Sequence, residues 1–332
     1  MKKAIIFGNG LGMALDPSSY GLPNAMKAAW SDASLGDDQK ALISACLPGN
    51  SGAPTAEEQL SVLQDTVTAC EVLVNVQKTS GDHWLTAQGQ GFPDAVYRFS
   101  FLVARQMHLA TFSNGPDQGN KCKLPSDFVE PLAQFIKQTS SHIATLNYDG
   151  LLASALIESE VLDCDKPVLL DGFLSSKFDR QNLFRPKGKG GWYMHLHGSP
   201  LFADRPKARP YKLSESTLKA AAASVRNAGK HVVLTHFRHK PKLIESSEIL
   251  STYWEFLDIA IEESSEIVLF GYSGNDLHLN RLISQVRGNR TLKIIEWLGS
   301  GTKDARNRFW SEQLGGAIEL RLLEDVLTFS DW

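Results

Sequence analysis

The sequence predicts an α/β protein with a doubly wound, mainly parallel sheet, and three observations support this fold class. Short apolar runs that end in glycine or polar residues recur along the whole chain, as in strands covered on both faces. Segments with helical spacing follow several of these runs, and such strand–helix alternation favours a parallel sheet. The 332 residues are 42% hydrophobic and 21% charged, which suits one elaborated globular domain.

The first predicted strand is followed by a long region without convincing strands. The strand is Lys3–Phe7, a short run with two β-branched residues that ends at a glycine. Thr55–Glu58 has a capping-box pattern, and the glycine-rich Gly81–Gly91 predicts a loop between helices. Helical spacing marks three segments: Leu60–Val74, Asp94–Leu109 and Pro125–Lys137. We therefore expect a large helical insertion over residues 24–140.

Strand patterns return in the second half of the chain. They cover His142–Leu146, Pro167–Leu170, Trp192–Leu196, His231–Thr235, Glu266–Phe270 and Leu292–Trp297, with Ala317–Leu323 as a final edge strand. Helical segments follow three of them: Asp149–Glu158, Ile249–Glu263 and Asp276–Val286. Residues 199–230 hold a Pro- and Lys-rich loop and one predicted helix, Glu215–Asn227, so we expect a second, smaller insertion without zinc there. Residues 1–332 are thus predicted to form a single domain with two insertions.

Composition and charge exclude several classes of protein. The net charge of −3 and the pI of about 6.3 argue against a protein built to grip nucleic acid. The basic clusters Arg205–Lys212 and Arg226–Lys242 are interpreted as solvated loops, with a partner or phosphate surface as the alternative. Four cysteines without any C-x-x-C pair exclude a ribbon-type zinc site and a secreted disulfide framework. No apolar run approaches the roughly 18–20 residues that span a bilayer, and we expect a cytoplasmic protein.

Glycines directly follow the first predicted strand in a Gly8-x-Gly10-x-Gly12 pattern. Glycines at this place, together with Asn9, would let backbone N–H groups approach a pyrophosphate, although a simple tight turn has the same pattern. The spacing departs from G-x-G-x-x-G, and no strand ending in an acidic residue follows about 20 positions on. An ordinary nicotinamide dehydrogenase is therefore disfavoured.

Asn147 and Asp149 follow the predicted strand His142–Leu146. An amide and a carboxylate side by side could bind a carboxamide, a ribose hydroxyl or an attacking water. The alternative is that one of the two caps the helix that begins here. Their position leaves both interpretations open.

Two histidines alternate with apolar residues at the end of Trp192–Leu196, so both are expected on one side of the strand. A metal site would need further ligands at sensible spacing, and none is evident. His195, one pleat earlier, is expected to be a satisfied core histidine. His197 lies at the strand mouth and is the better general base, because an imidazole titrates near neutral pH.

A second glycine-containing loop follows the most apolar predicted strand, Glu266–Phe270. The loop begins at Gly271, and its serine, amide and carboxylate side chains, Ser273, Asn275 and Asp276, could hold ribose hydroxyls or a phosphate. Asp276 could equally be the N-cap of the next helix, and the two roles are compatible. The chain contains neither G-x-S-x-G nor G-x-x-x-x-G-K-[ST], which disfavours serine hydrolases of that type and P-loop ATPases.

Taken in this order, the motifs resemble those of the sirtuin-like family of NAD-consuming proteins. The residues that carry the resemblance are Gly8-Asn9-Gly10 with Gly21-Leu22-Pro23, Thr145–Asp149, His197-Gly198-Ser199, and Gly271-Tyr272-Ser273 with Asp276. The resemblance implies a Rossmann-like fold in which the glycine loop holds the NAD pyrophosphate. It also implies that Asn147 positions water or the nicotinamide ribose, that Asp149 contacts the carboxamide, and that His197 is the general base. Ser273 and Asp276 would lie in the adenosine-side loop.

The departures from that family point to one of its branches. Sirtuin deacylases carry a Cys-x-x-Cys zinc module after the histidine motif, and this chain has none. Asn9 and Gly12 stand where the family's glycine loop has Ala and Ser. The chain is therefore more similar to the zinc-less bacterial branch, whose members are often NAD hydrolases that act as effectors in defence against phage.

The resemblance implies an NAD glycohydrolase that uses NAD as its substrate and needs no metal. Because unregulated cleavage would be toxic, we expect gating by homo-oligomer assembly, an activating partner subunit or a small-molecule signal, with residues 24–139 as a plausible assembly surface. The alternatives are an NAD or ADP-ribose sensor without turnover, a protein deacylase or ADP-ribosyltransferase, and a structural subunit with a vestigial site. Direct contacts with nucleic acid or membrane are not expected.

Overall fold

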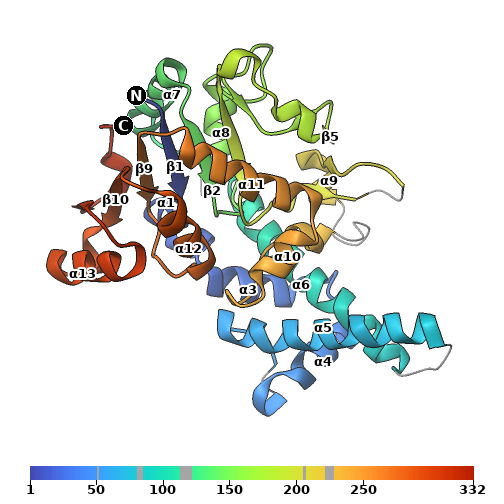
Figure 1. The fold of residues 1–332 in the computed structure, drawn as a ribbon. Coiled ribbons are helices and arrows are strands. Elements are labelled where there is room, and N and C mark those ends of the chain that lie inside the picture. Colours follow the sequence, from blue (N-terminus) through green and yellow to red (C-terminus); the bar gives the residue numbers. More distant parts are fainter. Residues whose placement is uncertain (51, 81–84, 113–121, 205–206, 221–227) are drawn as a thin grey trace.

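The computed structural model describes residues 1–50, 52–80, 85–112, 122–204, 207–220 and 228–332. Its centre is a seven-stranded sheet in the order β11-β10-β9-β1-β2-β6-β3, and all neighbouring strands are parallel (Figure 1). The strands are β1 (Lys3–Phe7), β2 (His142–Thr145), β3 (Leu169–Leu170), β6 (Gly191–His195), β9 (Glu266–Phe270), β10 (Thr291–Trp297) and β11 (Ile318–Leu323). The predicted α/β fold class with a parallel, Rossmann-like sheet is confirmed.

The order of the strands determines where a ligand can bind. From β1 the chain builds outward through β2 and β6 on one side, and later through β9, β10 and β11 on the other. Phe7 at the end of β1 is level with Thr145 of β2 and with Phe270 of β9, so three carboxyl ends lie side by side. In open parallel sheets this reversal of direction leaves a crevice outside the carboxyl ends.

Helices cover both faces of the sheet because alternate residues of each strand point to opposite sides. Ala4 and Ile6 of β1 pack with the helices of one face, and Ile5 and Phe7 pack with those of the other. The first face carries α11 (Glu248–Glu262), α12 (Leu277–Val286) and α13 (Lys303–Leu314). The second carries α1 (Gly10–Leu15), α7 (Ser126–Thr139) and α8 (Leu151–Glu158).

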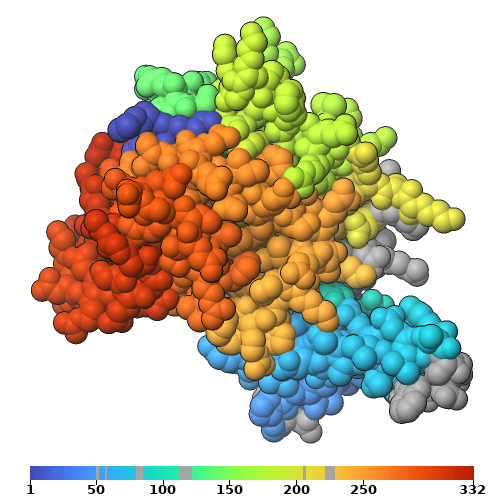
Figure 2. Space-filling view, in the orientation of Figure 1, coloured from blue at the N-terminus to red at the C-terminus, as the bar shows by residue number. Residues whose placement is uncertain are grey.

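Between β1 and β2 the described ranges contain helices and the loops that join them, and no strand. After α1 come α2 (Pro17–Tyr20), α3 (Leu22–Ser31), α4 (Asp37–Cys46), α5 (Glu57–Ser80) and α6 (Ala87–Ala110). Helices α3 to α6 share a second hydrophobic core, to which Tyr148 and residues between 203 and 234 also contribute. These helices form a lobe below the sheet in Figure 1, on the side of the carboxyl end of β1, and the same blue lobe lies at the bottom of Figure 2.

The predicted loop Gly81–Gly91 is wrong from residue 87 onward, because α6 begins at Ala87; residues 81–84 lie outside the described part of the chain. Thr86 caps the helix by accepting a hydrogen bond from the Gly89 amide at 3.3 Å. Glycine inside a helix costs about 1 kcal/mol relative to alanine. The cap and the burial of Phe92 in the helical core outweigh that preference here.

The predicted strand His231–Thr235 is also wrong. A 3-10 turn covers Ala228–His231, and after it only Val232 forms an isolated bridge, to Gly198. The run is apolar for another reason: Val232 and Leu234 pack into the helical core, whereas Val233 packs into the core of the sheet. Burial between two cores therefore produced a strand-like pattern.

Residues 199–230 contribute to a small antiparallel sheet that the sequence did not predict. Its order is β4-β5-β8-β7, with β4 (Phe173–Leu174), β5 (Lys177–Phe178), β7 (Phe202–Ala203) and β8 (Tyr211–Lys212). Helix α9 covers Glu215–Ala220, and the rest of the predicted helix Glu215–Asn227 falls outside the described residues. Helix α10 (Lys240–Glu245) then leads to α11. None of the helices in the described ranges has the length and apolar character needed to cross a membrane.

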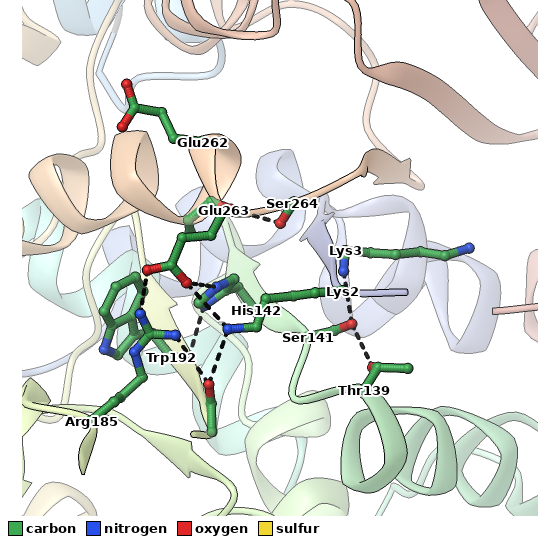
Figure 3. Close-up of polar contacts among 12 residues, drawn as sticks. Lys2, Lys3, Thr139, Ser141, His142, Arg185, Trp192, Glu262, Glu263 and Ser264 are labelled. Atoms are coloured by element: carbon green, nitrogen blue, oxygen red, sulfur yellow. Dashed lines mark hydrogen bonds and ion pairs between the residues drawn. The ribbon is translucent and has the colours of Figure 1, made fainter. Parts of the chain in front are cut away.

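A polar cluster joins elements at the opposite, amino-terminal end of the sheet (Figure 3). The Glu263 carboxylate accepts hydrogen bonds from Arg185 at 2.5 Å, Lys2 at 3.2 Å and His142 Nε2 at 3.3 Å. His142 Nδ1 accepts from the Trp192 amide, and the Arg185 guanidinium lies 3.7 Å from the centre of the Trp192 ring. The hydrogen bond from His142, followed by those from Arg185 and Lys2, holds the pKa of the Glu263 carboxyl well below its usual range.

Removing the charge of Glu263 should destabilise the fold without altering the far end of the sheet. Glu263→Gln leaves the buried Arg185 side chain without its carboxylate, and we expect unfolding to become about 1–3 kcal/mol easier. Urea unfolding followed by circular dichroism measures this change. Glu262→Gln is the matched control, since Glu262 points away from the cluster in Figure 3. Equal effects of the two variants would contradict the prediction.

Candidate active site

A cavity of about 800 Å³ lies at the carboxyl ends of the parallel strands. Its volume is within the range of about 300–1,000 Å³ that is common for small-molecule sites. Segments that follow β1, β2, β6, β9 and β10 all contribute to its wall. Eight of the predicted site residues line it: Gly8, Asn9, Gly10, Asn147, His197, Gly271, Ser273 and Asp276.

The glycines after β1 let two loops pack tightly. A Cβ atom at Gly8 would lie 2.7 Å from the Gly271 carbonyl oxygen, and one at Gly10 would lie 2.6 Å from the same atom. The amide of Gly8 donates to Phe270, and that of Gly10 donates to Gly271. These two N–H groups are therefore already used, and the glycines serve close approach of the β1 and β9 loops. Asn9 beside them has a buried side-chain oxygen without a hydrogen-bond partner in the described structure.

Asn147 is the most conspicuous polar residue of the cavity wall. It is 3% exposed, and neither its side-chain oxygen nor its side-chain nitrogen has a hydrogen-bond partner among the described residues. Its own amide donates to Thr145 Oγ1 at 3.1 Å, which fixes the backbone just after β2. Buried amides are normally satisfied, and an orphaned one requires an explanation. A ligand in the cavity would supply the missing partners.

Asp149 is not among the residues that line the cavity. One carboxylate oxygen accepts from the Leu151 amide at 3.1 Å, just before α8, although the N-cap residue of that helix is Gly150 and not Asp149. The other oxygen is buried without a hydrogen-bond partner in the described ranges. Burial raises the pKa of the Asp149 carboxyl to about 6.

The backbone around His197 is held from three sides. The His197 carbonyl accepts from the Val233 amide at 2.9 Å, and Trp254 Nε1 donates to the preceding Leu196 carbonyl at 2.8 Å. Gly198 has a φ of +82°, and a Cβ atom there would lie 1.7 Å from the His231 carbonyl oxygen. Only glycine lets the 231–233 segment pass so close. This packing points the His197 imidazole into the cavity.

His197 forms a hydrogen-bonded group with the side chains of Asp276 and Lys240. Its Nε2 lies 2.7 Å from Asp276 Oδ2, and Lys240 Nζ lies 2.9 Å from the same oxygen and 3.5 Å from His197 Nε2. Asp276 Oδ1 accepts from the His278 and Leu279 amides, so Asp276 also caps α12. The Asp276 carboxylate has thus both a capping role and a contact with the candidate base.

The protonation of this group follows from burial and charge. Burial, and then the positive charge of Lys240, lower the pKa of His197, although Asp276 opposes both. Burial alone would raise the pKa of the Asp276 carboxyl, but His197 and Lys240 hold it well below its usual range. Asp276 is therefore an anion that accepts the Nε2 proton of a neutral imidazole. Nδ1 of His197, which has no hydrogen-bond partner in the described structure, is the nitrogen that remains free to act as a base.

Sequence reasoning missed Lys240. The basic cluster Arg226–Lys242 was interpreted as a solvated loop, and the Arg238 side chain is indeed 61% exposed. Lys240 is only 6% exposed and lines the cavity. Nothing in the local pattern distinguishes it from the exposed basic residues on either side.

The end of β10 also contributes residues that the sequence did not indicate. Glu296 is 3% exposed, lines the cavity, and accepts hydrogen bonds from Arg306 and Trp310. Trp297 next to it lines the cavity with a side chain that is 60% exposed. The resemblance implied an adenosine-side loop nearby, and Ser273, which is exposed, lines the same cavity.

His195 lies in the core, as predicted, but it is not satisfied. It packs edge-on against the rings of Tyr193 and Phe202, and its Nδ1 has no hydrogen-bond partner in the described part of the protein. Burial lowers the pKa of His195 to about 3. No three His, Cys, Asp or Glu residues within the described ranges gather in a way that could hold a metal ion.

A comparison with known families shows the family to which the chain belongs. The family model described as "SIR2-like domain" matches residues 141–313, which is more than half of the chain. The protein belongs to the SIR2-like family. No curated protein matches the chain.

Membership of the SIR2-like family points to NAD-related activity. The matched residues of this SIR2-like protein include Asn147, His197, Lys240 and Asp276, and therefore the whole hydrogen-bonded group. The glycine loop after β1 lies outside the matched range but forms part of the same cavity. An orphaned amide, a neutral imidazole and an anionic carboxylate on one wall can orient and deprotonate a bound hydroxyl or water.

Proposed function

We propose that the protein is an NAD glycohydrolase, which cleaves NAD with water into nicotinamide and ADP-ribose. One observation carries the proposal: the buried, unpartnered Asn147 amide lines the same cavity as the His197–Asp276 pair. The amide is placed to hold a polar group of the substrate, and the imidazole is placed to accept a proton. The cavity volume accommodates a ligand of dinucleotide size.

The chemistry follows from these groups. The bond between the nicotinamide nitrogen and C1′ of the ribose breaks, and its electron pair leaves with nicotinamide, which becomes neutral. The ribose carbon develops oxocarbenium character, as in glycoside hydrolysis. Water adds to C1′ and its proton passes to Nδ1 of His197, while Asp276 holds the other ring nitrogen and stabilises the cation that forms. Asn147 orients the water or a ribose hydroxyl.

A product analysis separates this function from its alternatives. Purified protein is incubated with NAD, and nicotinamide and ADP-ribose are quantified by chromatography, with the expectation that they appear in equal amounts. Binding of NAD without nicotinamide release would favour a sensor. Formation of O-acyl-ADP-ribose with an acylated peptide would favour a deacylase, and label on an added protein would favour a transferase.

Truncating Asn147 should slow cleavage without preventing ligand binding. Loss of one preorganised polar group at a reacting centre typically costs about 10²–10³-fold in kcat, and we expect a decrease of that order for Asn147→Ala. Calorimetry with ADP-ribose should show that the variant still binds the product. Asn75→Ala, on the exposed side of α5, is the control. Turnover by Asn147→Ala at the wild-type rate would remove this residue from the mechanism.

We further propose, on the resemblance alone, that cleavage is gated by self-assembly or a partner and serves defence against phage. Assays of fractions separated by size would show whether turnover follows one assembly state. Intracellular NAD measured during phage infection would show whether the protein is switched on. Constant turnover in every fraction, with or without infection, would contradict gating.

A further inference from the structure

Residues 238–242 lie between helix α5 and the His197 group, and they contact both. We propose that Lys240 is a positioning residue for Asp276 and His197, and that α5 of the helical lobe holds Lys240 in place. The proposal concerns control of the site described above, and only its kinetic readout rests on the proposed function.

The Lys240 ammonium is held inside the protein by the catalytic group itself. Its side chain is 7% exposed, and that of Asp276 is 4% exposed. A charged amine is rarely buried unless it is paired. The ion pair with Asp276 at 2.9 Å supplies that partner, and it brings the amine within 3.5 Å of the His197 ring. A shift of this amine therefore changes the surroundings of the base directly.

The residues on either side of Lys240 are attached to α5. Asp65 of α5 accepts from Arg238 at 3.0 Å and lies 3.3 Å from His239 Nε2, so one carboxylate contacts two residues that precede Lys240. Further contacts join Arg238 and His239 to Ser61, and Lys242 to Thr68. Residues 61, 65 and 68 are spaced as one helix face. In Figure 2 the gold-orange surface of the segment that includes α10 lies against the light-blue surface of the segment that includes α5.

Through these contacts, the position of α5 in the helical lobe affects the protonation of His197. The ionisable groups around the imidazole are Asp276 and His278 at the start of α12, Lys240 of α10 and, across the ring, Tyr148 after β2. Lys240 Nζ lies 3.5 Å from His197 Nε2, and its positive charge disfavours the imidazolium. With α5 in place, Lys240 keeps His197 neutral and able to accept a proton. Movement of α5 would withdraw Lys240 and leave His197 protonated beside Asp276.

Titration of His197 by NMR tests the proposal without requiring turnover. The nine histidines are labelled at Cε1, and the His197 signal is assigned by its loss in His197→Gln. Lys240→Met should raise the pKa of His197 by about one unit or more, because a like charge at close range is removed. Lys240→Arg keeps the charge and should leave the pKa within a few tenths of a unit. An unchanged pKa in Lys240→Met would overturn the assignment of Lys240.

The role of α5 is tested by a substitution on that helix, with the pKa of His197 as the measured quantity. Asp65 is 57% exposed, so Asp65→Asn is expected to fold, and it removes the contacts with Arg238 and His239 together. The pKa of His197 should rise by a smaller amount than in Lys240→Met. Glu58→Gln, an exposed charge removal on the same helix, is the matched control and should have no effect. In the Lys240→Met background, Asp65→Asn should cause no further shift.

Two results would overturn the link to α5. One is a wild-type pKa of His197 in Asp65→Asn; the other is a full second shift in the double variant, which would mean that the effects are independent. Where turnover is measurable, the acidic limb of the kcat profile should move to higher pH in Lys240→Met and not in Lys240→Arg. Absence of turnover in the wild type would count against the glycohydrolase and would leave the NMR result to decide this inference.

Discussion

Replacing His197 by alanine should lower the rate of nicotinamide release by about 10²–10⁴-fold, the usual contribution of a general base. The loss follows from the geometry, since the imidazole lines the cavity with Nε2 held by Asp276 and Nδ1 free. Added imidazole should restore part of the activity, because the alanine variant leaves room for it beside Asp276. A steady-state assay with and without imidazole measures both effects.

Asp276→Asn separates the base from its orientation. The amide can donate to Nε2 and so favour the tautomer with the proton on Nδ1, which is the wrong nitrogen for the reaction. We expect a loss of about 10–10²-fold, smaller than that of the alanine variant because the imidazole remains. Imidazole should not rescue this variant. Rescue of Asp276→Asn, or no loss in His197→Ala, would contradict the assigned roles.

Mild acid should destabilise the protein strongly. Burial lowers the pKa of His108 and His142 to about 4 and that of His195 to about 3, whereas an unfolded histidine titrates near 6.5. Between these values the unfolded chain binds three protons that the folded chain does not. Asp149 has the opposite effect, because its pKa of about 6 lets the folded chain bind one proton first.

The net uptake on unfolding is therefore about two protons between pH 6 and 5, and stability should fall by about 3 kcal/mol over that unit. The stabilising contribution of the histidines is present above pH 6.5 and is lost as the pH falls toward 4. Urea unfolding at pH 7, 6 and 5 measures the slope. His142→Gln should reduce the slope by the contribution of one proton. Equal stability at pH 7 and 5 would contradict the prediction.

Local sequence patterns predicted the structure correctly where only one kind of element produces the pattern. The runs at β1, β2, β6, β9 and β10 each ended within one or two residues of the predicted position, because strands covered on both faces are continuously apolar. Sequence patterns gave a wrong prediction where the same composition occurs in two kinds of local structure. His231–Thr235 is apolar because it lies between two cores, and Gly81–Gly91 is glycine-rich although α6 begins within it.

Some residues of the candidate site could likewise be predicted from the sequence, and others could not. Asn147 and His197 could be predicted because each follows a strand directly, and parallel strands bring their carboxyl ends to one edge. Asp149 follows the same strand as Asn147 but turns to the start of α8, and the distinction depends on how the loop leaves the sheet. Lys240 could not be predicted, because a buried lysine and an exposed one have the same sequence surroundings.

The sequence by itself determined the parallel sheet, the absence of a C-x-x-C pair, and the glycine and polar residues that follow the strands, eight of which line the cavity. These properties are local, since they depend on periodicity and on the residue that ends each run. Only the tertiary structure decided that Asp276 binds His197 across 79 positions, that Lys240 joins them, and that α5 holds the segment around Lys240. Such contacts depend on how separate elements pack, and a hydrogen bond between distant side chains leaves no periodic trace in the chain.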